Sequence, residues 1–228
     1  VRERDLTGRD GKFIVEGKVT LDVFLSRSRF KPDSIFLETG RLPVLSLLLE
    51  NLPDNIPVYT ADQPVMDQIV GFPIHRGILA CGRKDDAAPL SDWLETNHHH
   101  TLVVAIGLSN HDNAGALFRN SAALGGDAII LDETSCDPLY RKSIRVSAGT
   151  ALWLPFHHGA TAGQIFNALD ASGYTLWTLT PGVTATSLYE AERPEKLAII
   201  LGPEGPGLPD DLIARGNAIR IPMSNEVD

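Results

Sequence analysis

The sequence of 228 residues has little cysteine, no long apolar run and no excess of positive charge. Its two cysteines, Cys81 and Cys136, lie far apart and form no Cys-x-x-Cys pair. This argues against a disulfide framework and against the usual zinc-site spacing. We interpret both as reduced thiols of a cytoplasmic protein. The longest apolar stretch, Leu42 to Leu49, is far shorter than the roughly 18 residues of a membrane helix, so we expect no membrane partner.

The net charge of −9 does not favour a nucleic-acid partner, because nucleic acids attract basic surfaces. The distribution of charge is more favourable than the sum. Five acidic residues between Val1 and Lys31 are outnumbered by eight basic ones, namely Arg2, Arg4, Arg9, Lys12, Lys18, Arg27, Arg29 and Lys31. A nucleic acid would therefore have to contact such a local patch.

The first part of the chain, residues 1–88, has the pattern of a small α/β domain. Short apolar runs predict strands, and stretches with helical spacing separate them. The expected strands are Phe13–Glu16, Ser34–Leu37, Ile56–Tyr59 and Ile78–Cys81, and the expected helices are Val19–Leu25, Leu42–Asn51 and Gln63–Val70. Residues 89–97 are mainly polar, and Pro89 opens them, so we interpret them as a linker.

Residues 98–228 predict a second domain with a parallel sheet. Continuous apolar runs are typical of strands that are buried on both faces. The expected strands are Thr101–Ile106, Ala128–Leu131, Tyr174–Thr180, Leu197–Leu201 and Ala218–Ile221, and the expected helices are Ala114–Leu124, Tyr140–Val146 and Ala160–Ala171. In such sheets ligands bind beyond the carboxyl ends of the strands, so the residues that follow each run are the candidates for a site.

The segment after the first of these runs contains Asn113, Gly115 and Arg119. We interpret Asn113 as a helix N-cap and expect Gly115 to allow a close approach at the first turn. A helix N-terminus together with an arginine suits an anion such as a phosphate group. The alternative is a capped helix with a surface arginine.

A glycine-rich loop, Leu201–Leu208, follows the fourth run directly. It lacks the Gly-Lys-Ser/Thr of a phosphate-binding P-loop and the Gly-x-Gly-x-x-Gly dinucleotide pattern. Its glycines allow a ligand to approach the backbone, although an ordinary turn remains the alternative. After the fifth run, Ile219–Met223 offers apolar side chains that suit an adenine ring, unless they are simply core.

Two histidine clusters, His98–His100 and His157–His158, do not predict a metal site. Adjacent residues cannot all face one ion, and no cysteine or acidic partner has ligand spacing. The segment Arg145–Gly149 is not the Gly-x-Ser-x-Gly of hydrolases. We expect three aromatic residues to be core rather than RNA-stacking, namely Tyr59, Phe72 and Trp93.

Taken together, the three segments resemble the signature motifs of the SpoU (TrmH-type) family of RNA methyltransferases, from about Leu102 to Asp228. Ala122–Leu131 and Cys136–Thr150 also look like this family, in the expected order. Phe13–Gly17 and Val70–Ala80 look like the substrate-binding domain that often precedes it. The resemblance implies an α/β fold in which a small RNA-binding domain precedes a parallel-sheet SPOUT domain with a C-terminal trefoil knot. It also implies a homodimer that uses S-adenosylmethionine.

Site residues are carried over from the motifs of this family. Arg119 and Asn113 are the candidate catalytic residues, and Glu204 is a fallback base. The cofactor would contact Leu179, Thr180, Leu201, Gly202, Glu204, Gly205, Gly207, Ile221 and Met223. Candidate RNA contacts are Arg119 and, in the basic N-terminal stretch, Arg9, Lys12 and Lys18. Arginine is a poor base because of its very high pKa, so Arg119 acts either as an activated base or as a phosphate clamp.

The expected function is 2′-O-methylation of a ribose in structured RNA, with ribosomal RNA favoured over transfer RNA. The alternative is a non-catalytic RNA-binding or ribosome-assembly module that keeps the fold. A nucleotide-dependent α/β enzyme of another kind would need a phosphate loop that we do not find. The family pattern continues beyond the third motif, so we expect the C-terminal end at Asp228 to be incomplete.

Overall fold

The computed structural model describes residues 10–50, 52–71, 74–85, 88–96 and 99–223. The chain forms two compact units. The first comprises residues 1–86, 111–119 and 137–153, and the second comprises residues 87–110, 120–136 and 154–228. The first unit thus contains two segments from the half of the chain in which the sequence predicts the second domain. The predicted domain boundaries stay a prediction.

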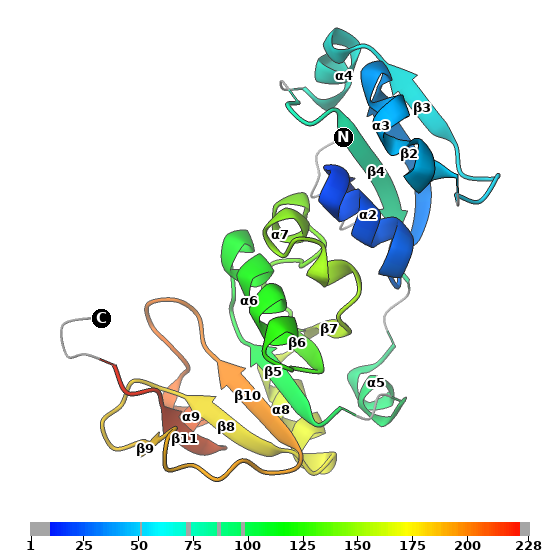
Figure 1. The fold of residues 1–228 in the computed structure, drawn as a ribbon. Coiled ribbons are helices and arrows are strands. Elements are labelled where there is room, and N and C mark those ends of the chain that lie inside the picture. The colour runs from blue at the N-terminus through cyan, green and yellow to red at the C-terminus, as the bar shows by residue number, and fades with distance from the viewer. Residues whose placement is uncertain (1–9, 51, 72–73, 86–87, 97–98, 224–228) are drawn as a thin grey trace. The chain divides into compact units, whose positions relative to one another are not determined.

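The first unit contains a four-stranded sheet with the strand order β1-β4-β2-β3 (Figure 1). Its strands are β1 (Lys12–Glu16), β2 (Lys31–Glu38), β3 (Val58–Ala61) and β4 (Ile78–Arg83). Strand β4 runs antiparallel to β1 and β2, whereas β2 and β3 are parallel, so the sheet is mixed. The connecting helices are α2 (Lys18–Arg27), η1 (Thr39–Arg41), α3 (Leu42–Leu49) and α4 (Gln63–Val70).

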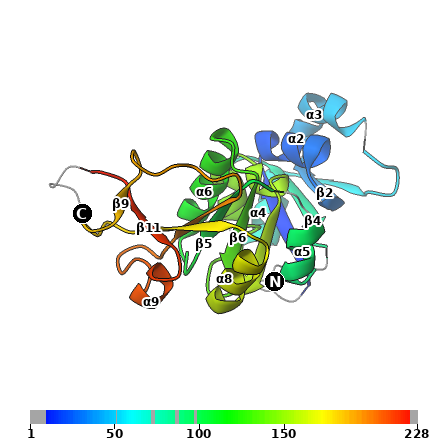
Figure 2. The same cartoon turned by 90° about the horizontal axis from the view of Figure 1, so that it is seen from below.

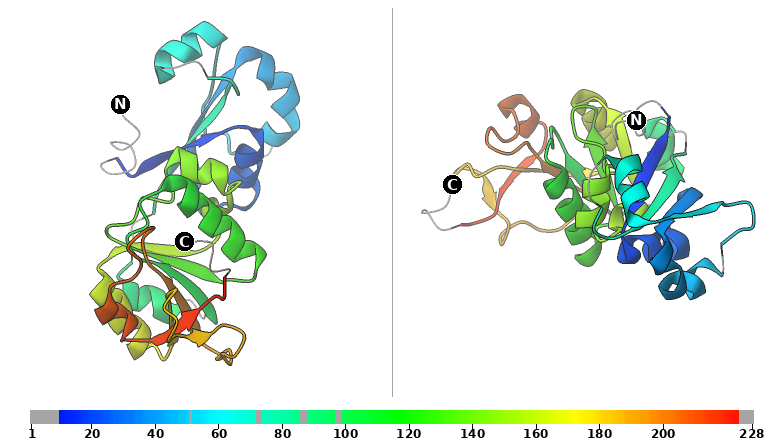
Figure 3. Two further views of the ribbon diagram at one scale, coloured as in Figure 1. Left: turned by 90° about the vertical axis from the view of Figure 1, so that its left-hand side faces the viewer. Right: turned by 90° about the horizontal axis from the view of Figure 1, so that it is seen from above.

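Different helices cover the two faces of this sheet (Figure 3). On one face the ring of Phe13 contacts those of Phe24 and Phe30, with centroid distances of 5.6 and 5.2 Å. The same ring lies over Gly82, where an added Cβ would come within 2.3 Å of it. On the other face Met66 of α4 packs in a cluster with Ile74 and Leu79. Tyr59 on the edge strand is 58% exposed, so the expectation that it is core was wrong. Phe72 lies outside the described residues.

Two later segments complete the first unit, namely the start of α6 (His111–Ala123) and the stretch of α7 (Arg141–Val146) and η2 (Thr150–Leu152). Gly115 of α6 lies so close to α7 that a Cβ would be 2.7 Å from Val146 Cβ and 2.8 Å from the Ser143 carbonyl oxygen. Arg141 forms a partly buried ion pair with Glu16 at 3.0 Å.

The second unit is built on a seven-stranded sheet with the order β7-β6-β5-β10-β8-β11-β9. The strands are β5 (Thr101–Ala105), β6 (Ala128–Asp132), β7 (Phe156–Ala160), β8 (Thr175–Leu179), β9 (Thr186–Ser187), β10 (Leu197–Leu201) and β11 (Asn217–Arg220). All six neighbouring pairs are parallel, which confirms the predicted parallel sheet. The sequence missed β7 and β9, which lie at the two edges.

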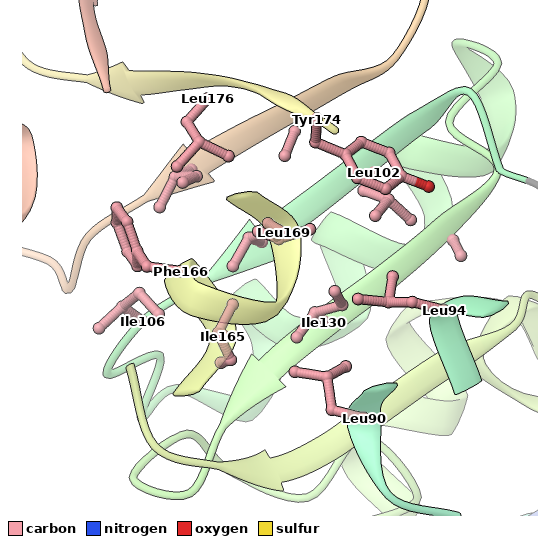
Figure 4. Close-up of a cluster of buried hydrophobic side chains, with 14 of the residues drawn as sticks. Leu90, Leu94, Leu102, Ile106, Ile130, Ile165, Phe166, Leu169, Tyr174 and Leu176 are labelled. Carbon is pink, nitrogen blue, oxygen red and sulfur yellow. The ribbon is translucent and has the colours of Figure 1, made fainter. Parts of the chain in front are cut away.

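One face of this sheet packs against α5 (Leu90–Thr96), α8 (Ala162–Ala171) and α9 (Asp210–Ile213). Figure 4 shows Phe166 and Leu169 of α8 among strand residues such as Leu102 and Ile130. The predicted linker therefore contains a helix that belongs to the core. Leu90, Trp93 and Leu94 of α5 are buried there, so Trp93 is core as expected.

Helix α8 begins at a capping box. The Thr161 hydroxyl accepts from Gln164 N at 3.2 Å, and the Gln164 side chain accepts from Thr161 N at 2.9 Å. These two bonds satisfy backbone donors that a helix start leaves free. The helix therefore begins two residues later than expected, and the residues before it form β7 instead. Among the described residues, no helix is long and apolar enough to cross a membrane.

Candidate active site

The glycine-rich loop after β10 is folded back on itself. A Cβ on Gly202 would come within 2.3 Å of Leu208 N, so this position has no room for any side chain. Gly207 N donates to the Pro203 carbonyl oxygen at 3.1 Å, and Gly205 and Gly207 both have positive φ, at 91° and 70°. Leu208 is buried in the core and anchors the end of the loop. Glu204 and Gly205 lie at the exposed tip of the loop.

The segment after β5 lies against this loop. Ile106 N donates to the Leu201 carbonyl oxygen at 2.9 Å, which extends the pairing of β5 with β10. Gly107 has a φ of 67°, and a Cβ there would be 3.3 Å from Pro203. The carboxyl ends of these two central strands therefore bring Gly107 and the glycine-rich loop together, as expected for a ligand site in a parallel sheet.

A buried carboxylate that the sequence interpretation did not single out supports the segment after β5. Asp132, at the end of β6, accepts from Gly107 N at 2.9 Å and from the hydroxyls of Thr134 and Ser135. The Ser135 hydroxyl in turn accepts from Leu108 N at 2.9 Å. The only signal in the sequence was an acidic residue directly after an apolar strand, and that pattern alone does not identify its partners.

Other predicted cofactor residues lie at or just after the ends of β8 and β11, two strands near one margin of the seven-stranded sheet (Figure 2). Thr180 N donates to the Ile219 carbonyl oxygen at 3.0 Å, which links the end of β8 to β11. Leu179 is half-buried. Ile221 and Met223, which follow β11, are 51% and 58% exposed, so in this chain alone they are not core. Exposed apolar side chains remain compatible with contact to an adenine ring.

Helix α6 begins at His111, three residues earlier than expected, so Asn113 is its third residue and not its N-cap. The prediction placed the helix start after Asn113 because an asparagine commonly precedes a first turn, but Asn110 now holds that position. Asn113 and Arg119 are both exposed. Among the described residues, Arg119 forms none of the ion pairs of at most 4.0 Å that occur there.

The predicted RNA contacts in the N-terminal stretch have different surroundings. Lys12 forms an ion pair with Asp33 at 2.9 Å, and the hydrogen bond to this carboxylate raises the pKa of Lys12. Its charge is therefore partly neutralised. Lys18 is the exposed first residue of α2, and Arg9 lies outside the described residues.

The histidines of β7 are engaged in hydrogen bonds. His157 Nε2 lies 3.1 Å from the Ala88 carbonyl oxygen, and His158 Nε2 lies 3.0 Å from that of Ser135. Burial lowers the pKa of His157, and the neighbouring His158 lowers it further against the raising effect of the Ala88 bond. Within the described ranges, no group of three or more His, Cys, Asp or Glu side chains could hold a metal ion. Among the described residues, neither Cys81 nor Cys136 forms a disulfide bond.

Comparison with known proteins decides which family these features belong to. The family model described as "SpoU rRNA Methylase family" matches residues 100–228, which is more than half of the chain. This chain belongs to the SpoU rRNA methylase family. The family members are RNA methyltransferases, and the resemblance inferred from the three motifs is confirmed.

Relatives of this SpoU chain extend the match into its first part. An uncharacterized tRNA/rRNA methyltransferase of Mycobacterium bovis is 34% identical over 231 residues, which cover 100% of this chain and 78% of the relative. The 23S rRNA (guanosine-2′-O-)-methyltransferase RlmB of Vibrio cholerae is 27% identical and is matched over 82% of this chain and 75% of its own length.

Solved structures show the same fold. The SpoU methyltransferase AviRb from Streptomyces viridochromogenes, in complex with the cofactor AdoMet, superposes with a TM-score of 0.81 at 17% sequence identity. The match covers 98% of this SpoU chain and 85% of that one. It confirms the predicted combination of a small α/β part with a parallel SPOUT-like sheet.

Proposed function

We propose that this chain transfers a methyl group from S-adenosylmethionine to a ribose 2′-hydroxyl of structured RNA, with ribosomal RNA as the favoured substrate. The observation that carries the proposal is the glycine-rich loop packed against Gly107 at the carboxyl ends of the two central strands. Membership of the SpoU family supports the reaction class. The name of the RlmB relative supports ribose as the acceptor and ribosomal RNA as the substrate.

The residues at this site fit S-adenosylmethionine. Gly207 leaves its backbone open to a ligand, because no atom of the chain lies within 4 Å of a Cβ built there. Gly202 lets the loop fold back on itself, because a Cβ there would come within 2.3 Å of Leu208 N. The backbone of Leu201–Gly207 would hold the cofactor, and Ile221 and Met223 would contact its adenine ring. Leu179 and Thr180 would lie beside them, since Thr180 N donates to the Ile219 carbonyl oxygen. When bound, the sulfonium of this cofactor supplies the methyl group.

Arg119 and Asn113 would act on the RNA. A guanidinium stays protonated in proteins, so Arg119 is better suited to clamp a phosphate group and orient the hydroxyl than to remove a proton. Its exposure on α6 leaves it accessible to a large substrate. Asn113 can hydrogen-bond the ribose or the phosphate. Glu204, at the exposed tip of the loop, remains a second candidate for the proton acceptor.

Three further features belong to the proposal. Lys18 and Arg9 would contact RNA, with Lys12 secondary because Asp33 already holds it. The C-terminal strands would pass through a trefoil knot. Two copies would form a homodimer in the cytoplasm, and exposed apolar residues near the β11 margin, such as Tyr189, Ile221 and Met223, support such an interface.

The deciding experiment is transfer from labelled S-adenosylmethionine to unmodified ribosomal and transfer RNA, with nucleosides identified by mass after digestion. A 2′-O-methylated nucleoside from ribosomal RNA is the expected product. A product from transfer RNA alone would overturn the substrate preference and keep the reaction. A base-methylated nucleoside would overturn the ribose assignment. If the protein shows neither methyl transfer nor cofactor binding, the proposal fails in favour of a non-catalytic RNA-binding module.

The assignment of Arg119 predicts a separation of catalysis from cofactor binding. Arg119→Ala should abolish transfer and leave S-adenosylmethionine affinity within about twofold, because the guanidinium would contact RNA only. Isothermal titration and a single-turnover assay measure the two effects. Arg193→Ala is the control. Arg193 donates a hydrogen bond to the Thr101 hydroxyl at the amino end of β5, and the loss of this bond should leave transfer intact. Cofactor affinity reduced about tenfold by Arg119→Ala would contradict the placement.

A further inference from the structure

Asp132 is almost completely buried, with 3% of its surface exposed, and it lies at the carboxyl end of β6. A buried carboxylate is costly unless hydrogen bonds compensate it. Its Oδ1 accepts from Gly107 N at 2.9 Å and from the Ser135 hydroxyl, and its Oδ2 accepts from the Thr134 hydroxyl at 2.6 Å. Both oxygens are thus satisfied by the two segments that follow β5 and β6.

The Ser135 hydroxyl extends this support by one residue. It donates its single proton to Asp132 and accepts from Leu108 N at 2.9 Å. Cys136 N donates to the Leu108 carbonyl oxygen at 2.7 Å. Two consecutive backbone N–H groups after β5 are therefore fixed by one carboxylate and one hydroxyl. This fixes the left-handed backbone of Gly107, which faces Pro203 of the glycine-rich loop.

We propose that Asp132 is a positioning residue for the cofactor site, because it fixes Gly107 and Leu108 and, through the contact of Gly107 with Pro203, the glycine-rich loop. This inference rests on the proposed function in one respect only, namely that S-adenosylmethionine is the ligand of this loop. Asp132 itself is too deeply buried to touch that ligand.

The role depends on hydrogen-bond acceptance and not on charge. In Asp132→Asn the amide oxygen can occupy the place of Oδ1, while the amide nitrogen donates to the Thr134 hydroxyl, which can reorient to accept. Asp132→Ala removes every acceptor and leaves buried donors without a partner. If the charge acted directly on the cofactor, the two variants would be equally impaired.

A matched control lies at the opposite end of the same strand. Asp127 accepts from His100 N at 2.9 Å and from Thr101 N at 2.8 Å, so it holds the amino end of β5 as Asp132 holds its carboxyl end. Asp127→Ala also removes two backbone hydrogen bonds from β5. It therefore reports the general cost of such a loss without disturbing the candidate site.

The experiment measures S-adenosylmethionine affinity by calorimetry and backbone amide hydrogen exchange for the full chain and each variant. Asp132→Ala should weaken binding about tenfold or more and Asp132→Asn no more than about threefold. Asp127→Ala should bind like the unmodified protein. In Asp132→Ala, exchange should accelerate in residues 107–108 and also in 202–208, whereas Asp127→Ala should accelerate it only near residue 100.

Unchanged affinity in folded Asp132→Ala, or equal losses in Asp132→Ala and Asp127→Ala, would overturn the inference. If Asp132→Ala does not fold, Ser135→Ala replaces it, because this change removes the acceptor of Leu108 N and one donor to Asp132 but leaves the carboxylate that accepts from Gly107 N. If the unmodified protein does not bind S-adenosylmethionine, the proposed function fails. The inference is then judged by hydrogen exchange alone, and unchanged protection of residues 202–208 in the variant would overturn it.

Discussion

Gly202 shows how a single position determines the shape of the glycine-rich loop. The backbone of Gly207 and Leu208 occupies the space that a side chain on Gly202 would need. Gly205 differs, because no atom lies within 4 Å of its hypothetical Cβ and only its φ of 91° favours glycine. Within one loop, Gly202 is therefore required for close packing, whereas Gly205 is favoured for its backbone conformation.

We expect Gly202→Ala to open the loop and to abolish S-adenosylmethionine binding, because its Cβ would meet backbone atoms that cannot move independently. The free energy of unfolding should fall by about 1–3 kcal/mol, as in other overpacked sites. Gly205→Ala is the control and should cost about 1 kcal/mol of backbone strain while binding persists. Thermal unfolding and calorimetry measure both. Equal binding by the two variants would contradict the packing argument.

At the residue scale, the sequence predicted site residues where the local composition is unusual, as in the loop with three glycines between Leu201 and Leu208. It could not predict Asp132, because the importance of this carboxylate depends on donors from another strand, 25 residues earlier in the chain. It also placed Asn113 one turn too early in its helix, because Asn110 and Asn113 are equally suited to precede a first turn.

In the first unit, helices α6 and α7 can cross closely because α6 has a glycine at the crossing. Gly115 lies against Val146 and the Ser143 carbonyl oxygen, and the Ser143 hydroxyl donates to the His111 carbonyl oxygen at 3.0 Å. Because α6 carries Asn113 and Arg119, this crossing fixes the helix that presents them.

We expect Gly115→Ala to separate the two helices and to lower the free energy of unfolding by about 1–3 kcal/mol. Gly163→Ala in α8 is the matched control, since no atom lies within 4 Å of its hypothetical Cβ. Alanine there should stabilise the helix by about 0.5–1 kcal/mol. Denaturant unfolding gives both values. A Gly115→Ala variant as stable as the Gly163→Ala variant would show that the crossing can relax.

At the element scale, the sequence identified the central strands of the second sheet, β5, β6 and β10, because they are continuous runs of apolar residues buried on both faces. Strand β7 escaped notice because Phe156–Ala160 contains two histidines and a glycine, and its exposed edge needs no apolar side chains. Helix α5 was taken for a linker because four of its seven residues are polar or acidic, although Leu90, Trp93 and Leu94 line one buried face.

For the whole molecule, we expect the stability to depend on pH because of His157. Burial lowers the pKa of His157 below its ordinary value of 6.5. Above that pH the imidazole is neutral in both states and contributes nothing. As the pH falls below 6.5, the unfolded chain binds a proton that the folded chain does not, so stability decreases until the folded pKa is reached. The lowered pKa of His111 acts in the same direction.

His157→Gln should therefore flatten the decrease in melting temperature between about pH 6.5 and pH 5. His75→Gln is the control, because His75 is exposed. Melting temperatures measured by calorimetry across this range test the expectation. An identical pH profile for the His157 variant and the unmodified protein would exclude burial of this imidazole as the cause.

The sequence predicted two sheets and the parallel character of the second, but not the composition of the compact units. Apolar periodicity reports which residues are buried within one element and not which distant segment covers them. Helix α7 and the start of α6 therefore belong to the first unit, although they follow the predicted linker in the chain.

The position of β10 in the strand order determines when the second sheet can be completed. Residues 197–201 pair with β5 on one side and β8 on the other, so a strand from near the end of the chain occupies the centre of the sheet. During synthesis, β5 and β8 must remain unpaired along these edges until about residue 201 has left the ribosome. Long-range pairing of this kind forms slowly, because the chain loses the entropy of closing a large loop before the strand contacts stabilise it. The glycine-rich loop can therefore form only after residues 197–201 have been synthesised, and shorter nascent chains have open strand edges through which they can aggregate.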